Sequence, residues 1–228
     1  MENNQFALIT GTSSGLGLEM AQYLLETGYN VIGLSRRGSP IEHSSYIDII
    51  CDLRDESSVM EVFDLISEST GSLDLIILNA GIFEMSPLVE TSSLEFTNHL
   101  NTNVLGAFHV MKHARDFIVE NETHIVTISS IASKKGLANI SAYSASKFAL
   151  NGMIDSLKEE WSHLGVRFST LMPGAIATEI WDNEANDLPR EQMLLMEDFM
   201  HVFKMVVTSS PNIQFPELVF LHSKGPMT

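Results

Sequence analysis

A short apolar segment that runs into a glycine-rich turn and then a helix constrains this fold more than any other stretch of the sequence. Residues 6–10 read FALIT, and glycines follow at positions 11, 15 and 17. Residues 18–28 then carry apolar side chains at helical spacing and end in glycine. A strand, a glycine-rich turn and a helix in this order provide the context in which a glycine motif binds a dinucleotide.

Glycine suits each of the three positions of this turn for a physical reason. Gly11 permits the tight turn, Gly15 lets the backbone approach a pyrophosphate, and Gly17 allows the helix to pack closely on the strand. Free N–H groups at the helix N-terminus would bind the phosphates. A purely structural turn is the alternative.

The end of the second expected strand indicates which dinucleotide would bind. Residues 30–35 read NVIGLS, and an NAD-binding fold places an acid at about this point to bind the adenosine ribose. Here Ser35 is followed by Arg36 and Arg37, and guanidinium groups hold a 2′-phosphate that an acid would repel. Two solvated surface arginines are the alternative. The pattern predicts NADP(H).

Strands and helices alternate along the rest of the chain. We expect further strands at 46–50, 73–78, 125–128 and 166–172, and helices at 55–68, 94–119 and 142–164. The alternation implies βαβ units with right-handed crossovers, and the nearly all-apolar strands indicate a sheet buried on both faces. The sequence therefore predicts an α/β fold, a single domain over residues 1–228 with a doubly wound parallel sheet of about seven strands and helices on both faces.

Composition argues against several classes of function. The 29 acidic and 13 basic residues give a net charge of −16, which argues against nucleic acid or a membrane as the main partner. No apolar run approaches the roughly 20 residues of a membrane span, and the N-terminus lacks the basic region of a signal peptide. The single cysteine, Cys51, suits the reducing cytoplasm. The eight histidines show no ligand spacing, so we expect no metal.

A second stretch with chemical content lies in the middle of the chain. An apolar segment ends in Ser129 and Ser130, and Tyr143 and Lys147 follow four positions apart. On a helix such positions share one face, so the ammonium would lower the pKa of the phenol from roughly 10. An ordinary solvated helix face is the alternative. Asn103 is unfavourable inside a helix, so it either caps a local group or has a role.

Together these residues resemble the short-chain dehydrogenase/reductase family, over essentially the whole chain. The motifs that carry the resemblance are Thr10-Gly11-xxx-Gly15-x-Gly17, Asp52-Leu53, Asn79-Ala80-Gly81, Asn103, Ser130, Tyr143-xxx-Lys147 and Pro173-Gly174-x-Ile176-x-Thr178. Ser130 rather than Ser129 takes the catalytic place, because its spacing from Tyr143 matches that of the family. One departure is Leu78, where the family often has Asn. The resemblance implies a Rossmann-like fold.

The resemblance also implies roles. Tyr143 would be the general acid/base, and Lys147 would lower its pKa and hold the nicotinamide ribose. Ser130 would orient the substrate carbonyl, and Asn103 would anchor a water that relays protons. The implied cofactor-binding residues are Gly11, Ser13, Ser14, Gly15, Leu16, Gly17, Ser35, Arg36, Arg37, Asp52, Leu53, Asn79, Ala80, Gly81, Tyr143, Lys147, Pro173, Gly174, Ile176 and Thr178.

The expected function is NADP(H)-dependent hydride transfer between nicotinamide and a small-molecule carbonyl or secondary alcohol. A non-catalytic NADP(H)-binding sensor and an epimerase or dehydratase on the same fold are the alternatives. As in the family, a homodimer or homotetramer would form, with two subunits packed through the helices at 94–119 and 142–164.

The resemblance places a substrate flap at residues 179–196. The run of Met and Leu at 193–196 has an alternative reading as ordinary helix core. Phe83, Met85, Leu137 and Trp181 are expected to form apolar pocket walls.

Overall fold

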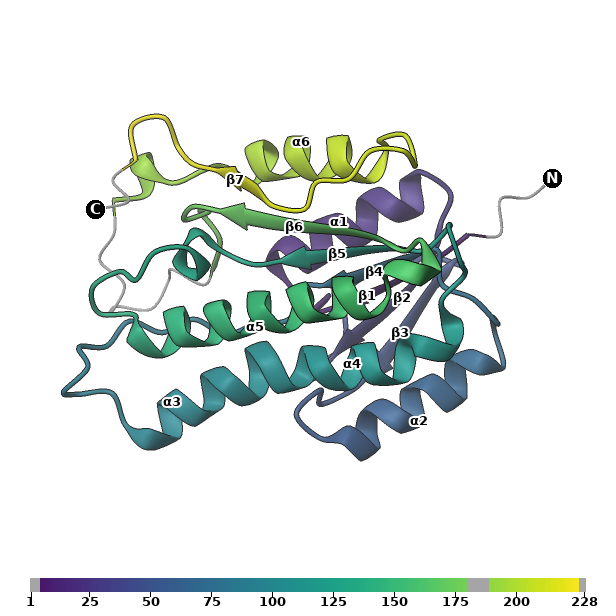
Figure 1. The fold of residues 1–228 in the computed structure, drawn as a ribbon, viewed down its shortest axis with the longest axis horizontal. Coiled ribbons are helices and arrows are strands. Elements are labelled where there is room, and N and C mark those ends of the chain that lie inside the picture. The colour runs from purple at the N-terminus through teal and green to yellow at the C-terminus, as the bar shows by residue number, and fades with distance from the viewer. Residues whose placement is uncertain (1–4, 180–188, 226–228) are drawn as a thin grey trace.

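The chain forms a seven-stranded sheet in which every neighbouring pair of strands is parallel. The computed structural model describes residues 5–179 and 189–225 (Figure 1). The strand order is β3-β2-β1-β4-β5-β6-β7. The strands are β1 (Phe6–Thr10), β2 (Asn30–Ser35), β3 (Tyr46–Ile50), β4 (Leu75–Leu78), β5 (His124–Ile128), β6 (Arg167–Pro173) and β7 (Leu218–Phe220). The predicted doubly wound α/β fold is confirmed.

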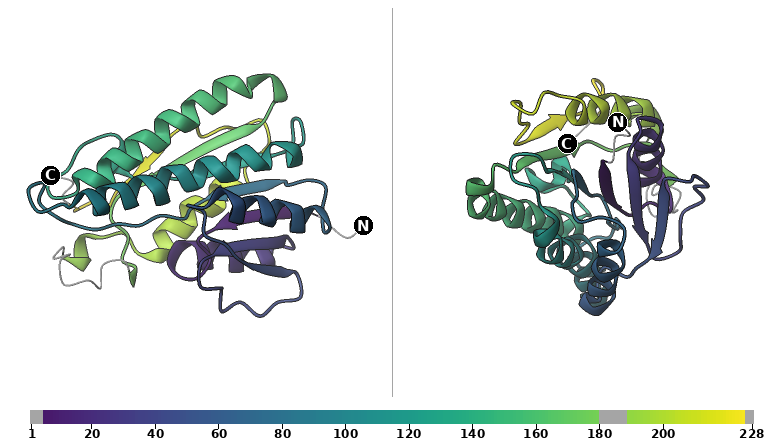
Figure 2. Two further views of the ribbon diagram at one scale, coloured as in Figure 1. Left: turned by 90° about the horizontal axis from the view of Figure 1, so that it is seen from below. Right: turned by 90° about the vertical axis from the view of Figure 1, so that its right-hand side faces the viewer.

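Helices cover both faces of the sheet (Figures 1 and 2). On one face lie α1 (Gly15–Glu26) and α6 (Met196–Val207), and on the other lie α2 (Glu56–Ser67), α3 (Ser93–Leu100), α4 (Gly106–Ala114) and α5 (Ser141–Glu160). The strands are apolar throughout because alternate side chains enter different cores. In β1, Leu8 packs beneath α2 and α4, whereas Ala7 and Ile9 pack beneath α1 and α6.

The single helix expected at 94–119 is interrupted. Between α3 and α4 the chain forms a π-helical turn, Asn101–Leu105, and a short 3₁₀ turn, Arg115–Phe117, follows α4. Asn103 lies inside the π-helical turn, where its buried side chain hydrogen-bonds to the backbone of Ile82. Such turns are often found at functional sites.

Other boundaries differ from expectation by small amounts. β4 begins at Leu75, since Leu73 forms only an isolated bridge with Ile118. The helix expected at 142–164 ends at Glu160, and a 3₁₀ turn then leads into Gly165, which has a φ of +66°. Glycine adopts this left-handed conformation without the strain of a Cβ, and so it ends the element.

The strand order indicates at which edge of the sheet a ligand would bind. The chain winds outward from β1 to β3 and then returns to β4 on the other side of β1. In open parallel sheets, ligands bind outside the carboxyl ends of the strands at this reversal point. The glycine-rich turn between β1 and α1 lies there. Within the described ranges, no helix is long and apolar enough to cross a membrane.

Candidate active site

A cavity of about 840 Å³ opens along the carboxyl ends of the strands. Loops that follow β1, β2, β3, β4, β5 and β6 all contribute to its wall. Gly17 and Asn103 are the predicted site residues that do not line it. The predicted residues that do line it are Gly11, Ser13, Ser14, Gly15, Leu16, Ser35, Arg36, Arg37, Asp52, Leu53, Asn79, Ala80, Gly81, Ser130, Tyr143, Lys147, Pro173, Gly174, Ile176 and Thr178.

The glycines of the turn divide into structural and cavity-facing positions. A Cβ on Gly17 would overlap the Gly11 carbonyl oxygen and lie 2.6 Å from the Asn79 side-chain nitrogen. Gly15 has a φ of +58°, and no atom lies within 4 Å of the point that a Cβ would occupy, so its open side faces the cavity. Asn79 Nδ2 donates to the carbonyl oxygens of Thr10, at 2.9 Å, and Gly11, at 3.3 Å, and thereby fastens the turn to β4.

The N-terminus of α1 has the properties of a phosphate site. Ser14 is the N-cap residue, but its side chain makes no capping hydrogen bond, and the first turn carries no acid. The N–H groups of this turn and the helix dipole favour an anion. The Ser35 hydroxyl, at the end of β2, is buried and has no hydrogen-bond partner. The residues present therefore fit a dinucleotide, whose phosphates would take the turn and whose ribose end would lie near Ser35.

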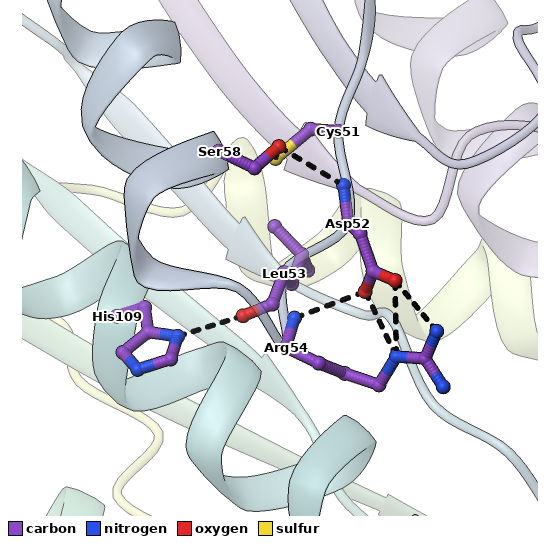
Figure 3. Close-up of polar contacts among 6 residues, drawn as sticks. All are labelled: Cys51, Asp52, Leu53, Arg54, Ser58 and His109. Carbon is purple, nitrogen blue, oxygen red and sulfur yellow. Dashed lines mark hydrogen bonds and ion pairs between the residues drawn. The ribbon is translucent and has the colours of Figure 1, made fainter.

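The loop after β3 is held in place by contacts from two helices (Figure 3). Ser58 Oγ, from α2, accepts the Asp52 N–H at 3.3 Å, and His109 Nδ1, from α4, lies 2.8 Å from the Leu53 carbonyl oxygen that accepts its proton. Arg54 also lines the cavity and binds the Asp52 carboxylate. The sequence reasoning missed Arg54, although a cation two positions after a motif acid is a visible signal.

Three polar side chains meet where β5 and α5 approach each other. Ser130 Oγ accepts the Ala132 N–H at 3.1 Å and hydrogen-bonds to the Tyr143 hydroxyl. Lys147 Nζ donates to the Ile128 carbonyl oxygen at 3.0 Å and lies 5.6 Å from the centre of the Tyr143 ring. Ser129 is turned to Asn151, to which its hydroxyl donates at 2.7 Å. Ser130 is therefore the serine that meets the phenol.

Burial shifts the pKa values of Tyr143 and Lys147 in opposite directions. Burial raises the pKa of Tyr143 to about 12, and its hydrogen bond with Ser130 opposes that rise only in part. Burial also lowers the pKa of Lys147 to about 8. Lys147 is not among the causes of the Tyr143 shift, so the expectation that its ammonium lowers the phenol pKa stays a prediction.

Asn103 lies behind the cavity wall. Its Oδ1 accepts the Ile82 N–H at 2.8 Å, and its Nδ2 donates to the Ile82 carbonyl, at 3.1 Å, and to Ser146 Oγ, at 2.9 Å. Ser146 Oγ in turn donates to the Tyr143 carbonyl oxygen at 2.7 Å. The sequence reasoning missed Ser146, which faces Asn103 one residue before Lys147. Asn103 therefore caps a local group, one of the two alternatives left open by the sequence.

The expected apolar wall residues lie in the cavity wall where the structure describes them. Phe83, Met85 and Leu137 line it, and the Phe83 ring meets the Tyr143 ring edge-on, with centroids 4.9 Å apart. Trp181 and residues 180–188 of the expected flap lie outside the described residues. At the other end of the flap, Met193 and Leu194 are buried but precede α6, and Leu195 is exposed. These residues therefore include core positions, but they are not the helix core of the alternative reading.

Comparison with known proteins places the chain in a family. The family model for short chain dehydrogenases matches residues 5–189. The chain is 35% identical over 179 residues to 3-amino-tetrahydro-pyrrolizinone reductase of Xenorhabdus hominickii, which covers 77% of this chain and 63% of that protein. It is 32% identical over 174 residues to 3-oxoacyl-(acyl-carrier-protein) reductase MabA of Mycobacterium avium. This match covers 76% of this chain and 68% of that protein. The chain belongs to the short-chain dehydrogenase family of oxidoreductases.

Solved structures agree on the fold. An alcohol dehydrogenase from the archaeon Thermococcus sibiricus, complexed with 5-hydroxy-NADP, superimposes with a TM-score of 0.87. The match covers 98% of this chain and 99% of that chain at 21% identity. At this level of identity the likeness concerns the fold alone.

Proposed function

We propose that this protein transfers a hydride between NADP(H) and a small carbonyl compound or the corresponding secondary alcohol. The observation that carries the proposal is the meeting of Ser130, Tyr143 and Lys147 on the wall of the cavity that the glycine-rich turn also lines. The nicotinamide would supply the hydride, so the chain has to supply position and a proton.

Tyr143 is the proposed general acid. With a pKa of about 12 the phenol is protonated at neutral pH, and it can donate to a carbonyl oxygen in reduction. Ser130 already hydrogen-bonds to this phenol, so a carbonyl oxygen at the same point would receive both hydroxyls. In the reverse reaction, oxidation of the alcohol, the phenolate of the same residue would accept the proton.

Lys147 and Asn103 are proposed to assist Tyr143 and Ser130. Lys147 is buried and uses one N–H on Ile128, which leaves two donors for the ribose hydroxyls of the nicotinamide half. Both amide protons of Asn103 are used on Ile82 and Ser146. We therefore assign its side chain a positioning role, holding the start of α5, in addition to the water-anchoring role implied by the resemblance, for which its carbonyl oxygens can act as acceptors.

The preference for NADP(H) over NAD(H) rests on the residues after β2. Ser35, Arg36 and Arg37 line the cavity, the two arginines are exposed, and the Ser35 hydroxyl has no partner. This arrangement can bind a 2′-phosphate through charge-assisted hydrogen bonds. A homo-oligomer in the cytoplasm is part of the same proposal, and the single buried cysteine, Cys51, fits that compartment.

The test is NADPH oxidation, followed by the absorbance of reduced nicotinamide, across aldehydes, ketones and quinones. NADH runs in parallel, and the Tyr143→Phe variant is the control. We expect turnover with NADPH and a loss of at least about 100-fold in the variant, because the proton donor is gone.

Each alternative gives a distinct result. Tight NADPH binding with no turnover of any carbonyl indicates a sensor. Conversion of a substrate without net consumption of NADPH indicates an epimerase or dehydratase. Binding of neither nucleotide contradicts the proposal.

A further inference from the structure

One end of the cavity gathers four charged side chains on two neighbouring loops. The charged residues lining it there are Arg36, Arg37, Asp52 and Arg54, which carry three positive charges and one negative charge, a net of +2. The Cys51 N–H donates to the Ser35 carbonyl oxygen at 2.8 Å, so the loops after β2 and β3 run side by side. Asp52 therefore lies near Arg36, and the pKa of its carboxyl is lowered first by Arg54 and also by Arg36.

Arg54 binds the Asp52 carboxylate at both oxygens (Figure 3). Its Nε lies 2.9 Å from Oδ1 and 3.1 Å from Oδ2, and its Nη2 donates to Oδ2 at 2.6 Å. The Arg54 backbone N–H also donates to Oδ1, at 3.1 Å. Two-point pairs of this kind are among the stronger charge-assisted contacts in proteins.

The backbone that carries the pair is fixed. Besides the contacts of Ser58 and His109 with this loop, Gly106 of α4 approaches so closely that a Cβ there would lie 2.9 Å from the Leu53 Cβ. An isolated surface ion pair contributes little because two flexible side chains must be ordered. Here the Arg54 and Asp52 side chains are 39% and 36% exposed, but the backbone beneath them is held, so ordering the pair costs less and Arg54 can keep the carboxylate in one place.

We propose that Arg54 sets the preference for the 2′-phosphorylated cofactor by keeping Asp52 from pairing with Arg36. This inference rests on the proposed function. A free carboxylate beside Arg36 would compete with a phosphate for the guanidinium and would repel the phosphate as well. With Asp52 paired, Arg36, Arg37 and the unpartnered Ser35 hydroxyl stay available to the phosphate. Arg54 is thus a positioning residue that acts through Asp52.

The experiment compares Arg54→Gln, Asp52→Asn and the double variant by isothermal titration. The two probes are adenosine 2′,5′-bisphosphate and adenosine 5′-monophosphate, which differ only in the 2′-phosphate. Lys158→Gln is the matched control, because it removes a cation from the Lys158–Asp155 pair on α5 instead. Thermal melts establish that each variant is folded.

We expect Arg54→Gln to weaken binding of the bisphosphate about fivefold or more and binding of the monophosphate by less than about twofold. Asp52 is itself an implied cofactor-binding residue, so variants that change it are judged by the ratio of bisphosphate to monophosphate affinity, in which contacts to the shared adenosine cancel. The double variant should keep the wild-type ratio, since no carboxylate is left to compete. Asp52→Asn should have at least the wild-type ratio, and this variant alone tests the inference if Arg54→Gln does not fold. The NADPH to NADH affinity ratio should follow the same order.

Equal losses for both probes would overturn the inference, and so would a double variant as weak as Arg54→Gln. An Asp52→Asn variant whose ratio of bisphosphate to monophosphate affinity is below that of the wild type would overturn it too. A wild type that binds neither NADPH nor NADH, or prefers NADH, removes both the NADP(H) proposal and this inference. A wild type that prefers NADPH, with the ratio unchanged in Arg54→Gln, removes the inference alone.

Discussion

At the scale of single residues, burial decides the ionisation of the two proposed proton-handling groups. Tyr143 and Lys147 share one face of α5, as their spacing requires, but each is desolvated, and desolvation favours the neutral form of both. The phenol pKa is therefore high and the ammonium pKa low. The structure leaves the phenol as an acid at neutral pH and makes Lys147 the group that titrates near physiological pH.

The pH dependence of reduction follows from the directions in which the pKa values of Tyr143 and Lys147 are shifted. Lys147 is positively charged below a pKa of about 8 and loses its charge as the pH rises through that value. If its charge binds the cofactor, kcat/KM for NADPH should fall as the pH rises past about 8, since this parameter reports the enzyme before the cofactor is bound. Lys147→Arg should lose this limb because a guanidinium stays charged. A wild-type profile that is flat between about pH 7 and 10 would contradict the assignment.

At the scale of elements, the two glycines of the β1–turn–α1 unit have different roles, one in packing and one at the ligand site. Gly17 has no room for a side chain because the helix lies against the Gly11 carbonyl, whereas Gly15 faces open space with a positive φ. Asn79 ties the same turn to β4 through two hydrogen bonds. The turn is thus a rigid part of the sheet edge, and its open side is the part available to a ligand.

Alanine at these two glycines should therefore have different effects. Gly17→Ala should lower the free energy of unfolding by about 3 kcal/mol or more, because the Cβ forces α1 away from β1. Gly15→Ala should cost only about 1–2 kcal/mol for its left-handed backbone but should weaken NADPH binding, because the Cβ enters the cavity. Urea denaturation and nucleotide titration check the two effects. Equal destabilisation by both substitutions would refute this division of roles.

At the scale of the whole molecule, the helices on one face of the sheet expose large apolar side chains. Phe96 of α3, Phe108 of α4 and Phe148 of α5 are 37%, 43% and 47% exposed. These helices lie next to one another in Figures 1 and 2 and are the ones expected to join two subunits. Exposed apolar side chains on helices that lie side by side are typical of an interaction surface.

We predict that a Phe108→Glu/Phe148→Glu double variant dissociates the oligomer, because it buries two charges without partners at the interface. Light scattering coupled to gel filtration should show multiples of 25.3 kDa for the wild type and one chain for the variant. Leu65→Glu, at a similarly exposed position on α2, is the control and should leave the mass unchanged. A wild-type mass of one chain would show that this face has another use.

The fold class and most of the elements follow from local patterns in the sequence. Apolar runs, glycine punctuation and caps such as Asp55 act over a few residues, so β2, β3 and the start of α2 are found where local pattern places them. The family resemblance assigned Ser35 and Tyr143, far apart in sequence, to one cofactor, and both line the cavity. They can meet because the carboxyl ends of parallel strands lie at one edge of the sheet.

The electrostatics and the long-range polar contacts, by contrast, depend on the tertiary structure. The interruption of the helix at Asn103 depends on Ile82 and Ser146, which are 21 and 43 residues away in sequence. The high pKa of Tyr143 depends on how completely the packed chain excludes water from it. Periodicity describes a residue's own neighbours along the chain, whereas desolvation and pairing depend on what the fold brings against it from elsewhere.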